Sequence, residues 1–142
     1  MEGYIMDTSA WIEFFRGSPE GKKVAEYLFP ELTEIAPSVT PTLVITEMQS
    51  VYIRNGEGDK FSEDVEKIQR LSEIEERINQ KIAINAGMKH GNIHNKENRI
   101  SYVDCILWTL AEERNMKVIS TDEHFRKCEN AVYIEKGGYH DI

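Results

Sequence analysis

Short apolar segments alternate along this chain with longer segments of helical periodicity, and this alternation limits the possible folds more than any other feature. We expect strands at residues 3–6, 34–39, 116–120 and 131–134, and an ambiguous, Glu-rich strand within 71–78. We expect helices at 11–16, 19–28, 40–52, 61–70, 79–88 and 101–113, a helical turn at 123–127, and polar loops at 55–59 and 89–100. Because strands joined through helices pair in parallel by right-handed crossovers, this order predicts a three-layer α/β/α sandwich with a mainly parallel central sheet.

The size and composition of the chain fit one domain. It has 142 residues, 40% of them hydrophobic, so we expect residues 1–142 to form a single domain around one core. No apolar run approaches the roughly 20 residues of a membrane-spanning helix, and the first residues lack the features of a signal peptide. We therefore expect a cytoplasmic protein without a membrane segment. Cys105 and Cys128 are far apart in the sequence, which favours two reduced thiols over a disulfide or a metal site.

The charge of the chain is strongly acidic, with a formal net charge of −8 at pH 7. This balance argues against a protein that grips nucleic acid through a broad basic surface. It remains compatible with an enzyme that meets a phosphate backbone at one site through metal ions, and it suits a basic partner.

Two aspartates follow apolar strands. Asp7 comes directly after the first expected strand, and Asp122 follows the strand that ends near Ser120. The carboxyl ends of parallel strands share one edge of a sheet, where ligands bind in open α/β folds. We therefore expect both carboxylates at that edge.

Two further acids lie where helices are otherwise apolar. Glu47 lies four residues from both Leu43 and Val51, inside an apolar stripe. Asp104 shares a helix face with Leu107 and with the residues beyond it. Burying an ionised carboxylate without a partner costs several kcal/mol or more, so both side chains are expected to point into a polar cleft.

Several carboxylates can share a cleft if divalent cations offset their repulsion. An all-oxygen ligand set favours Mg²⁺ or Mn²⁺ over zinc, and two such ions roughly 3.5–4 Å apart can activate water and stabilise the leaving oxygen of a phosphodiester. None of the four histidines has a ligand spacing. His124 follows Asp122 closely and could approach a phosphate, although a surface or capping role fits it better.

Each acid except Glu47 also has an ordinary structural explanation. Asp7 and Asp122 could cap the helices that follow them, and Ser101 with Asp104 matches a capping box. Glu47 has no capping role in the middle of its helix. The hypothesis of a shared site therefore depends on the set of acids rather than on any single one.

Four segments also resemble one protein family in its own motif order. Residues 4–15 resemble the opening segment of VapC-type PIN domains, and residues 46–48, 101–106 and 119–125 resemble the second, third and fourth acidic motifs. The resemblance spans nearly the whole chain. One departure is Trp108, which stands four residues after the third acid, where such proteins usually have a small residue.

This resemblance implies strand order 3-2-1-4-5 and Mg²⁺- or Mn²⁺-dependent endoribonuclease activity, often on structured RNA such as tRNA or rRNA. It further implies a small VapB-type antitoxin as partner, as in a type II toxin–antitoxin system, and we expect a homodimer. By motif match, Asp7, Glu47, Asp104 and Asp122 would form the acidic quartet. Thr8, Ser9 and Thr121 could hydrogen-bond the quartet, although capping explains each of them equally well.

The only locally basic stretch is residues 89–99. Together with Arg16 it supplies the candidate RNA contacts Lys89, Lys96 and Arg99, against the alternative of a solvated polar loop. Two other functions stay open at this point. One is a catalytically inactive PIN-like adaptor or RNA-binding module. The other is a phosphotransfer or phosphatase domain that uses Asp7 covalently, which is disfavoured because no second acid lies two positions on.

Overall fold

A computed structural model describes residues 3–31 and 36–137. Its centre is a five-stranded sheet in the order β3-β2-β1-β4-β5, and all four strand pairings are parallel. The strands are β1 (Tyr4–Met6), β2 (Ser38–Pro41), β3 (Glu73–Glu75), β4 (Lys117–Ser120) and β5 (Ala131–Tyr133). The predicted sheet and its strand order are confirmed.

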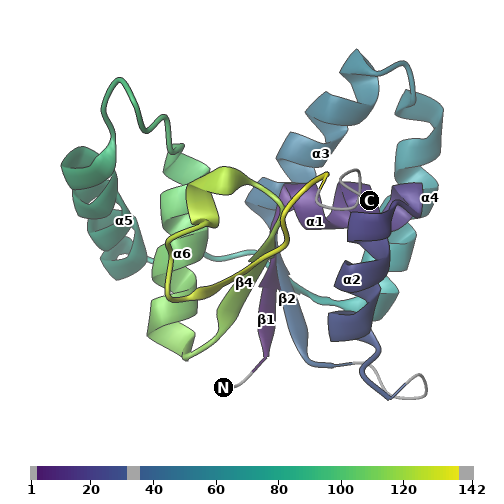
Figure 1. Ribbon diagram of the computed structural model, residues 1–142, viewed down its shortest axis with the longest axis horizontal. Helices are drawn as coiled ribbons and strands as arrows, with labels where there is room; N and C mark the ends of the chain where they lie inside the picture. Colours follow the sequence, from purple (N-terminus) through teal and green to yellow (C-terminus); the bar gives the residue numbers. More distant parts are fainter. Residues whose placement is uncertain (1–2, 32–35, 138–142) are drawn as a thin grey trace.

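Helices cover both faces of this sheet. They are α1 (Thr8–Arg16), α2 (Pro19–Leu28), α3 (Thr42–Arg54), α4 (Gly58–Leu71), α5 (Gln80–Ile93) and α6 (Tyr102–Arg114), with a 3₁₀ turn η1 (Glu123–Phe125). Helices α1 to α4 lie on one side of the sheet and α5 and α6 on the other (Figure 1). This arrangement is the three-layer sandwich that the sequence predicts. The strand order reverses at β1, whose neighbours are β2 on one side and β4 on the other.

The inner strands supply the centre of the core. Ile5 and Met6 of β1 and Val118 and Ile119 of β4 are fully buried, as expected for a parallel sheet covered on both faces. Trp11 of α1 is also fully buried, and its indole N–H donates to Thr40 Oγ1 at 3.0 Å. This bond ties α1 to the end of β2, so the first residues of α1 are held at the carboxyl edge of the sheet.

Local signals in the sequence set the helix ends. Gly17 ends α1 with φ of 64°, a left-handed conformation in which glycine meets no steric cost. Ser18 then caps α2 by accepting from the N–H of Gly21 at 3.0 Å. Ser101 and Asp104 form the predicted capping box of α6. Helix α6 continues without a break through Trp108, so this departure from the family pattern does not disturb the helix.

Several predicted boundaries are wrong. Helix α1 starts at Thr8 rather than near residue 11, and α4 starts at Gly58, inside the loop expected at 55–59. The strand expected at 34–39 starts at Ser38, and residues 34–35 lie outside the described part of the chain. Thr40 and Pro41 are the last residues of this strand and do not start α3. Backbone pairing with β3 as far as Glu75 explains the longer strand. The loop expected at 89–100 begins only after Ile93, because α5 packs along α6 and Lys89 bonds Glu112 across that contact at 2.8 Å.

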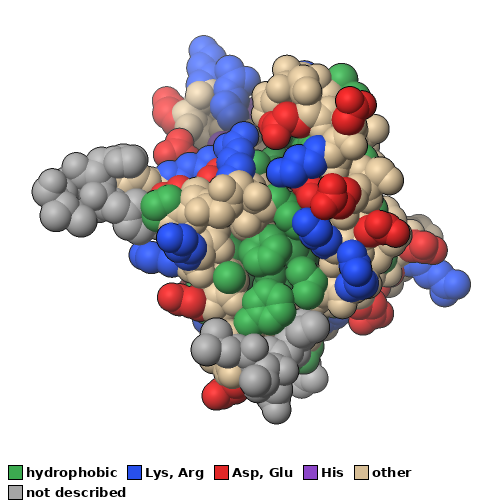
Figure 2. All heavy atoms as spheres, turned by 90° about the vertical axis from the view of Figure 1, so that its right-hand side faces the viewer, with side chains coloured by type: hydrophobic (Ala, Val, Ile, Leu, Met, Phe, Trp, Pro, Cys, Tyr) green, Lys and Arg blue, Asp and Glu red, His purple; other side chains and the backbone are tan. Residues whose placement is uncertain are grey.

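Cys105 and Cys128 are free and buried, and burial raises the pKa of each thiol to about 11, so both are expected to be unreactive. Among the residues that the structure describes, no helix combines the length and apolar character needed to span a bilayer. On the side of α2, α3 and α4, apolar side chains gather at the surface among charged ones (Figure 2).

Candidate active site

An open cleft of about 560 Å³ lies at the carboxyl edge of the sheet. All four acids singled out in the sequence line it: Asp7, Glu47, Asp104 and Asp122. Asp7 directly follows β1, Asp122 follows β4, Glu47 comes from α3 and Asp104 from the first turn of α6. Four separate elements therefore bring these carboxyl groups to one place, as the topology predicts.

Asp7 is the most enclosed of the four, with 4% of its surface exposed. Its Oδ2 accepts from Ser120 Oγ at 2.7 Å and from Ser9 Oγ at 3.1 Å, and its Oδ1 accepts from the N–H of Thr8 at 2.8 Å. Asp7 is thus also the cap of α1, so the capping explanation and a role in the cleft are compatible.

Glu47 is fixed by its neighbour across the cleft. Thr8 Oγ1 donates to Glu47 Oε1 at 2.7 Å. This bond joins α1 to α3 and holds the carboxyl group of Glu47 in the cleft that Asp7 also lines. It explains how an acid can lie on an otherwise apolar stripe.

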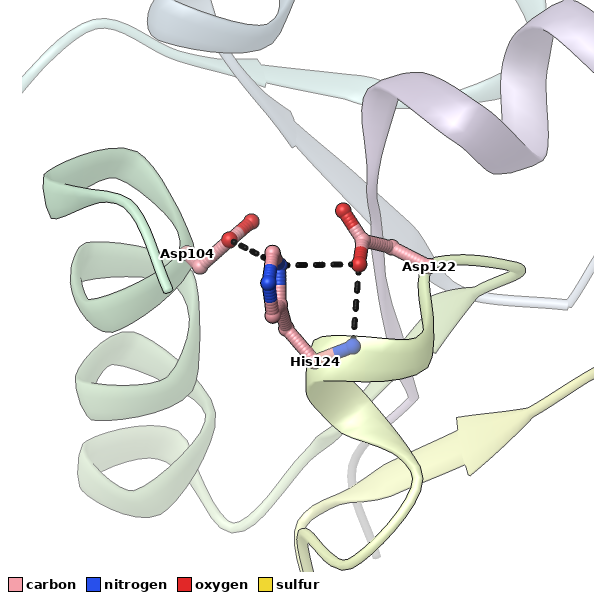
Figure 3. A group of neighbouring side chains, drawn as sticks. All are labelled: Asp104, Asp122 and His124. Carbon is pink, nitrogen blue, oxygen red and sulfur yellow. Dashed lines mark hydrogen bonds and ion pairs between the residues drawn. The ribbon is translucent and has the colours of Figure 1, made fainter. Parts of the chain in front are cut away.

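Asp104 and Asp122 lie on either side of His124 (Figure 3). His124 Nδ1 is 3.0 Å from Asp122 Oδ1 and 3.5 Å from Asp104 Oδ2. The backbone N–H of His124 donates to Asp122 Oδ1 at 2.9 Å, and Asp104 Oδ2 accepts from the N–H of Ser101 at 3.1 Å. The two carboxyl groups are therefore held by backbone donors while facing the same imidazole ring.

Burial and mutual repulsion disfavour the charged forms of the carboxyl groups in the cleft. Burial, with repulsion from Asp104 and Glu47, raises the pKa of Asp7 to about 7. Burial is also the largest reason why the pKa values of Glu47 and Asp104 are raised, and each is raised further by neighbouring carboxylates. Hydrogen bonds from Ser120, Thr8 and Ser101 oppose these shifts only in part.

The donor set fits a divalent cation. All four acids line one cleft, where a bound cation would relieve their mutual repulsion. The buried Nδ1 of His124 has no hydrogen-bond partner among the described residues. Oxygen-rich sites of this kind suit Mg²⁺ and Mn²⁺. The group Asp104, Asp122 and His124 offers ligand atoms that all lie within 4.8 Å of one another.

The structure brings together some of the predicted supporting residues. Thr8 and Ser9 contact the acids through their hydroxyl groups. Thr121 is buried, and its backbone N–H donates to Ser9 Oγ at 3.0 Å. The hydroxyl of Thr121 has no hydrogen-bond partner among the described residues. Ser120 and His124 were not predicted as part of the site. The adjacency of Ser120 to the strand end, and of His124 to Asp122, was a signal, but neither spacing distinguishes a site residue from a cap.

Basic side chains border the cleft, but only one of them was predicted. Arg16 lines it, together with Arg54 and Lys136, which the sequence pattern did not single out. Lys89 instead bonds Glu112 and lies over the Trp108 ring, 4.7 Å from its centroid. Lys96 and Arg99 are exposed and do not line the cleft.

Comparisons with known proteins agree with the fold. The family model described as PIN domain matches residues 4–130. The structure is similar to DNA-bound VapBC from Salmonella typhimurium (17% identity, TM-score 0.67, covering 95% of this chain and 98% of the other). It is also similar to a toxin–antitoxin complex from Klebsiella pneumoniae (15% identity, TM-score 0.65, covering 94% of this chain and 98% of the other). A third similar structure is VapC20 from Mycobacterium tuberculosis, described as a sarcin-ricin loop cleaving toxin (14% identity, TM-score 0.68, covering 90% of this chain and 96% of the other). No curated protein sequence matches.

Proposed function

The chain belongs to the PIN-domain family, and from this membership we propose that it is a divalent-metal-dependent endoribonuclease, the toxin of a type II toxin–antitoxin pair. One observation carries the proposal: four carboxyl groups from four elements line one cleft at the carboxyl edge of the sheet. A protein without catalysis gains nothing from the electrostatic cost of this arrangement. For the same reason we favour the enzyme over an inactive adaptor.

In this proposal Asp7, Glu47, Asp104 and Asp122 hold Mg²⁺ or Mn²⁺. A bound cation would lower the pKa of a water molecule that it binds and would place positive charge beside the phosphate. Ser120, Ser9 and Thr8 orient the carboxyl groups of Asp7 and Glu47 through the hydrogen bonds given above. In this proposal no carboxyl group acts as a covalent nucleophile. Water attacks phosphorus, the P–O3′ bond breaks and the 3′ oxygen leaves, so the products carry a 5′-phosphate and a 3′-hydroxyl.

The substrate in this proposal is a structured RNA such as tRNA or rRNA. The basic rim of Arg16, Arg54 and Lys136 supports it, because these side chains line the acidic cleft and can contact the phosphate backbone of a bound RNA. The structural neighbour from Mycobacterium tuberculosis is itself described as cleaving the sarcin-ricin loop.

We propose a small antitoxin as the partner and a homodimer as the assembly. Structural neighbours in this group were solved as toxin–antitoxin complexes. The apolar surface among charged side chains near α2, α3 and α4 offers area that a protein partner can cover (Figure 2).

An RNA cleavage assay tests the enzyme. Purified protein is incubated with total tRNA and rRNA in Mg²⁺, in Mn²⁺ and in EDTA, and the ends of the products are mapped. We expect cleavage in the presence of metal, none in EDTA, and loss of about a hundredfold or more in Glu47→Gln. Glu63→Gln, which removes an exposed acid of α4 outside the cleft, is the matched control and should cleave normally.

Four results would contradict the proposal. A 2′,3′-cyclic phosphate product would indicate attack by the RNA itself. Cleavage that persists in EDTA would exclude the metal mechanism. An aspartyl adduct formed with a phosphate-mimicking fluoride would indicate covalent use of Asp7, and metal-bound protein that cleaves no RNA while binding its partner would favour the adaptor.

A further inference from the structure

The imidazole of His124 occupies an unusual position for a capping or surface residue. It comes from η1, yet its Nδ1 lies between an acid that follows β4 and an acid of α6, at 3.0 Å from Asp122 and 3.5 Å from Asp104 (Figure 3). The next residue, Phe125, is fully buried and anchors η1 in the core. The backbone bond from His124 to Asp122 then fixes the ring beside the acid.

The contacts of Nδ1 are not those of an ordinary ion pair. The atom is buried and has no hydrogen-bond partner among the described residues, although a carboxylate oxygen lies only 3.0 Å away. An N–H donor at this distance normally points at its acceptor. Here Nδ1 lies between the two carboxyl groups, within 3.5 Å of an oxygen of each (Figure 3).

These separations match those between ligands of one cation. Ligands at about 2.1 Å from an ion lie roughly 3.0 Å apart at right angles and about 3.4 Å apart at the tetrahedral angle. The observed values are 3.0 and 3.5 Å, and all three ligand atoms lie within 4.8 Å of one another. The three residues can therefore ligate a single ion with little rearrangement.

We propose that His124 Nδ1 is a direct ligand of the divalent cation held by Asp104 and Asp122, so that this position has a mixed nitrogen and oxygen ligand set. The inference rests on the proposed metal-dependent function. Ligation requires the lone pair on Nδ1 and the proton on Nε2. Imidazole suits transition metals better than Mg²⁺, so His124 makes this position select Mn²⁺ over Mg²⁺.

The direct test is the nitrogen coupling of bound Mn²⁺. Pulsed electron paramagnetic resonance of the whole protein with Mn²⁺ should show a histidine ¹⁴N coupling, which changes to the ¹⁵N pattern when the protein is grown with ¹⁵N-histidine. The labelling requires no mutation, so the result does not depend on a variant that folds. The coupling should disappear in His124→Ala and remain in His94→Ala, a histidine whose ring stacks on His90 outside the cluster.

Affinity gives a second readout that is independent of catalysis. By calorimetry, His124→Ala should weaken Mn²⁺ binding by about tenfold or more and Mg²⁺ binding by less than about threefold. If His124→Ala weakens the binding of Mn²⁺ and Mg²⁺ equally, His124 does not make the site select Mn²⁺ over Mg²⁺.

The outcomes separate this inference from the proposed function. Mn²⁺ that binds without a nitrogen coupling, or a coupling that survives in His124→Ala, would overturn the role of His124. The metal site itself would still stand if Asp7→Asn weakens Mn²⁺ binding. If wild-type protein binds neither Mn²⁺ nor Mg²⁺, both the inference and the proposed function fall.

Discussion

Ser120 Oγ donates to Asp7 Oδ2 at 2.7 Å, joining the last residue of β4 to the residue that follows β1. The bond crosses between neighbouring strands at the point where the strand order reverses, and Ser9 Oγ lies 3.2 Å from the same hydroxyl. It is a buried bond to a group that is costly to ionise. Ser120 therefore favours the charged form of Asp7, which is the form that binds a cation.

Replacing this hydroxyl tests its role. We expect Ser120→Ala to weaken Mg²⁺ binding by about tenfold at neutral pH, because Asp7 then becomes harder to ionise and less well oriented. The measurement is calorimetric titration of the metal. Ser72→Ala is the matched control: it removes a buried hydroxyl bonded to Thr40 at 2.8 Å, outside the cleft, and should lower stability without weakening metal binding. Unchanged metal affinity in Ser120→Ala would show that this bond is only structural.

The raised pKa of Asp7 predicts how the stability of the metal-free protein depends on pH. The folded state holds a proton on Asp7 up to about pH 7, whereas the unfolded chain releases it near 3.8. A folded pKa above the unfolded one gives stability that is full below the unfolded pKa and is lost as the pH rises through the folded pKa. We therefore expect the free energy of unfolding in EDTA to fall between about pH 4 and pH 7, by at most about 4 kcal/mol from this group.

Asp7→Asn isolates that contribution. Metal-free Asp7→Asn should melt several degrees above the wild type at pH 8, while the two proteins should approach equal stability near pH 4. Saturating Mg²⁺ should raise the melting temperature of the wild type far more than that of the variant. Wild-type stability that stays flat or increases from pH 4 to pH 7 in EDTA would contradict the prediction.

The sequence predicted the sheet and the gathering of acids for the same physical reason. Alternating strands and helices leave few arrangements other than a parallel sheet, and in such a sheet Asp7 and Asp122 must reach one edge. Glu47 could be predicted as a site residue because a carboxylate on an apolar helix stripe must point into a polar cleft. Local chemistry also predicted the capping box of α6, since Ser101 and Asp104 lie only three residues apart in the sequence.

Features that depend on distant contacts were not predictable from the pattern. The last turn of α5 is polar in sequence and is helical because of its packing on α6. The roles of His124 and Ser120 depend on which acids lie across from them, and the approach of Arg54 and Lys136 to the cleft depends on how α3 and the chain after β5 are placed. None of these relationships leaves a period or spacing in the sequence that identifies it.

A buried pair outside the cleft gives a prediction about stability. Tyr52 O–H donates to Asp64 Oδ2 at 2.5 Å, and the side chain of Asp64 is fully buried, with Lys60 Nζ 3.9 Å from the same oxygen. Tyr52→Phe leaves this carboxyl group without its donor and should lower the free energy of unfolding by about 2–3 kcal/mol. Denaturation with urea measures it.

A double substitution separates the bond from the packing. Tyr52→Phe combined with Asp64→Leu removes both polar partners, so it should recover most of the loss seen in Tyr52→Phe. If the double variant is less stable than the single one, the cost arises from packing around Tyr52 rather than from an unsatisfied carboxyl group.

The basic rim of the cleft gives a prediction that distinguishes two possible RNA-binding surfaces: the rim seen in the structure and the basic loop expected from the sequence. Arg54 lines the acidic cleft. Its Nε donates to the Ser50 carbonyl at 3.4 Å, so the terminal N–H groups of the guanidinium can contact a phosphate. Arg54→Ala should weaken RNA binding and reduce the slope of log affinity against log salt by about 0.7 to 1, the loss of one phosphate contact. Lys67→Ala, on α4 and paired with Glu63, is the matched control and should leave the slope unchanged. If Lys96→Ala or Arg99→Ala lowers the slope and Arg54→Ala does not, the RNA follows the loop after α5, as the sequence pattern indicated, and the rim of the cleft does not contact it.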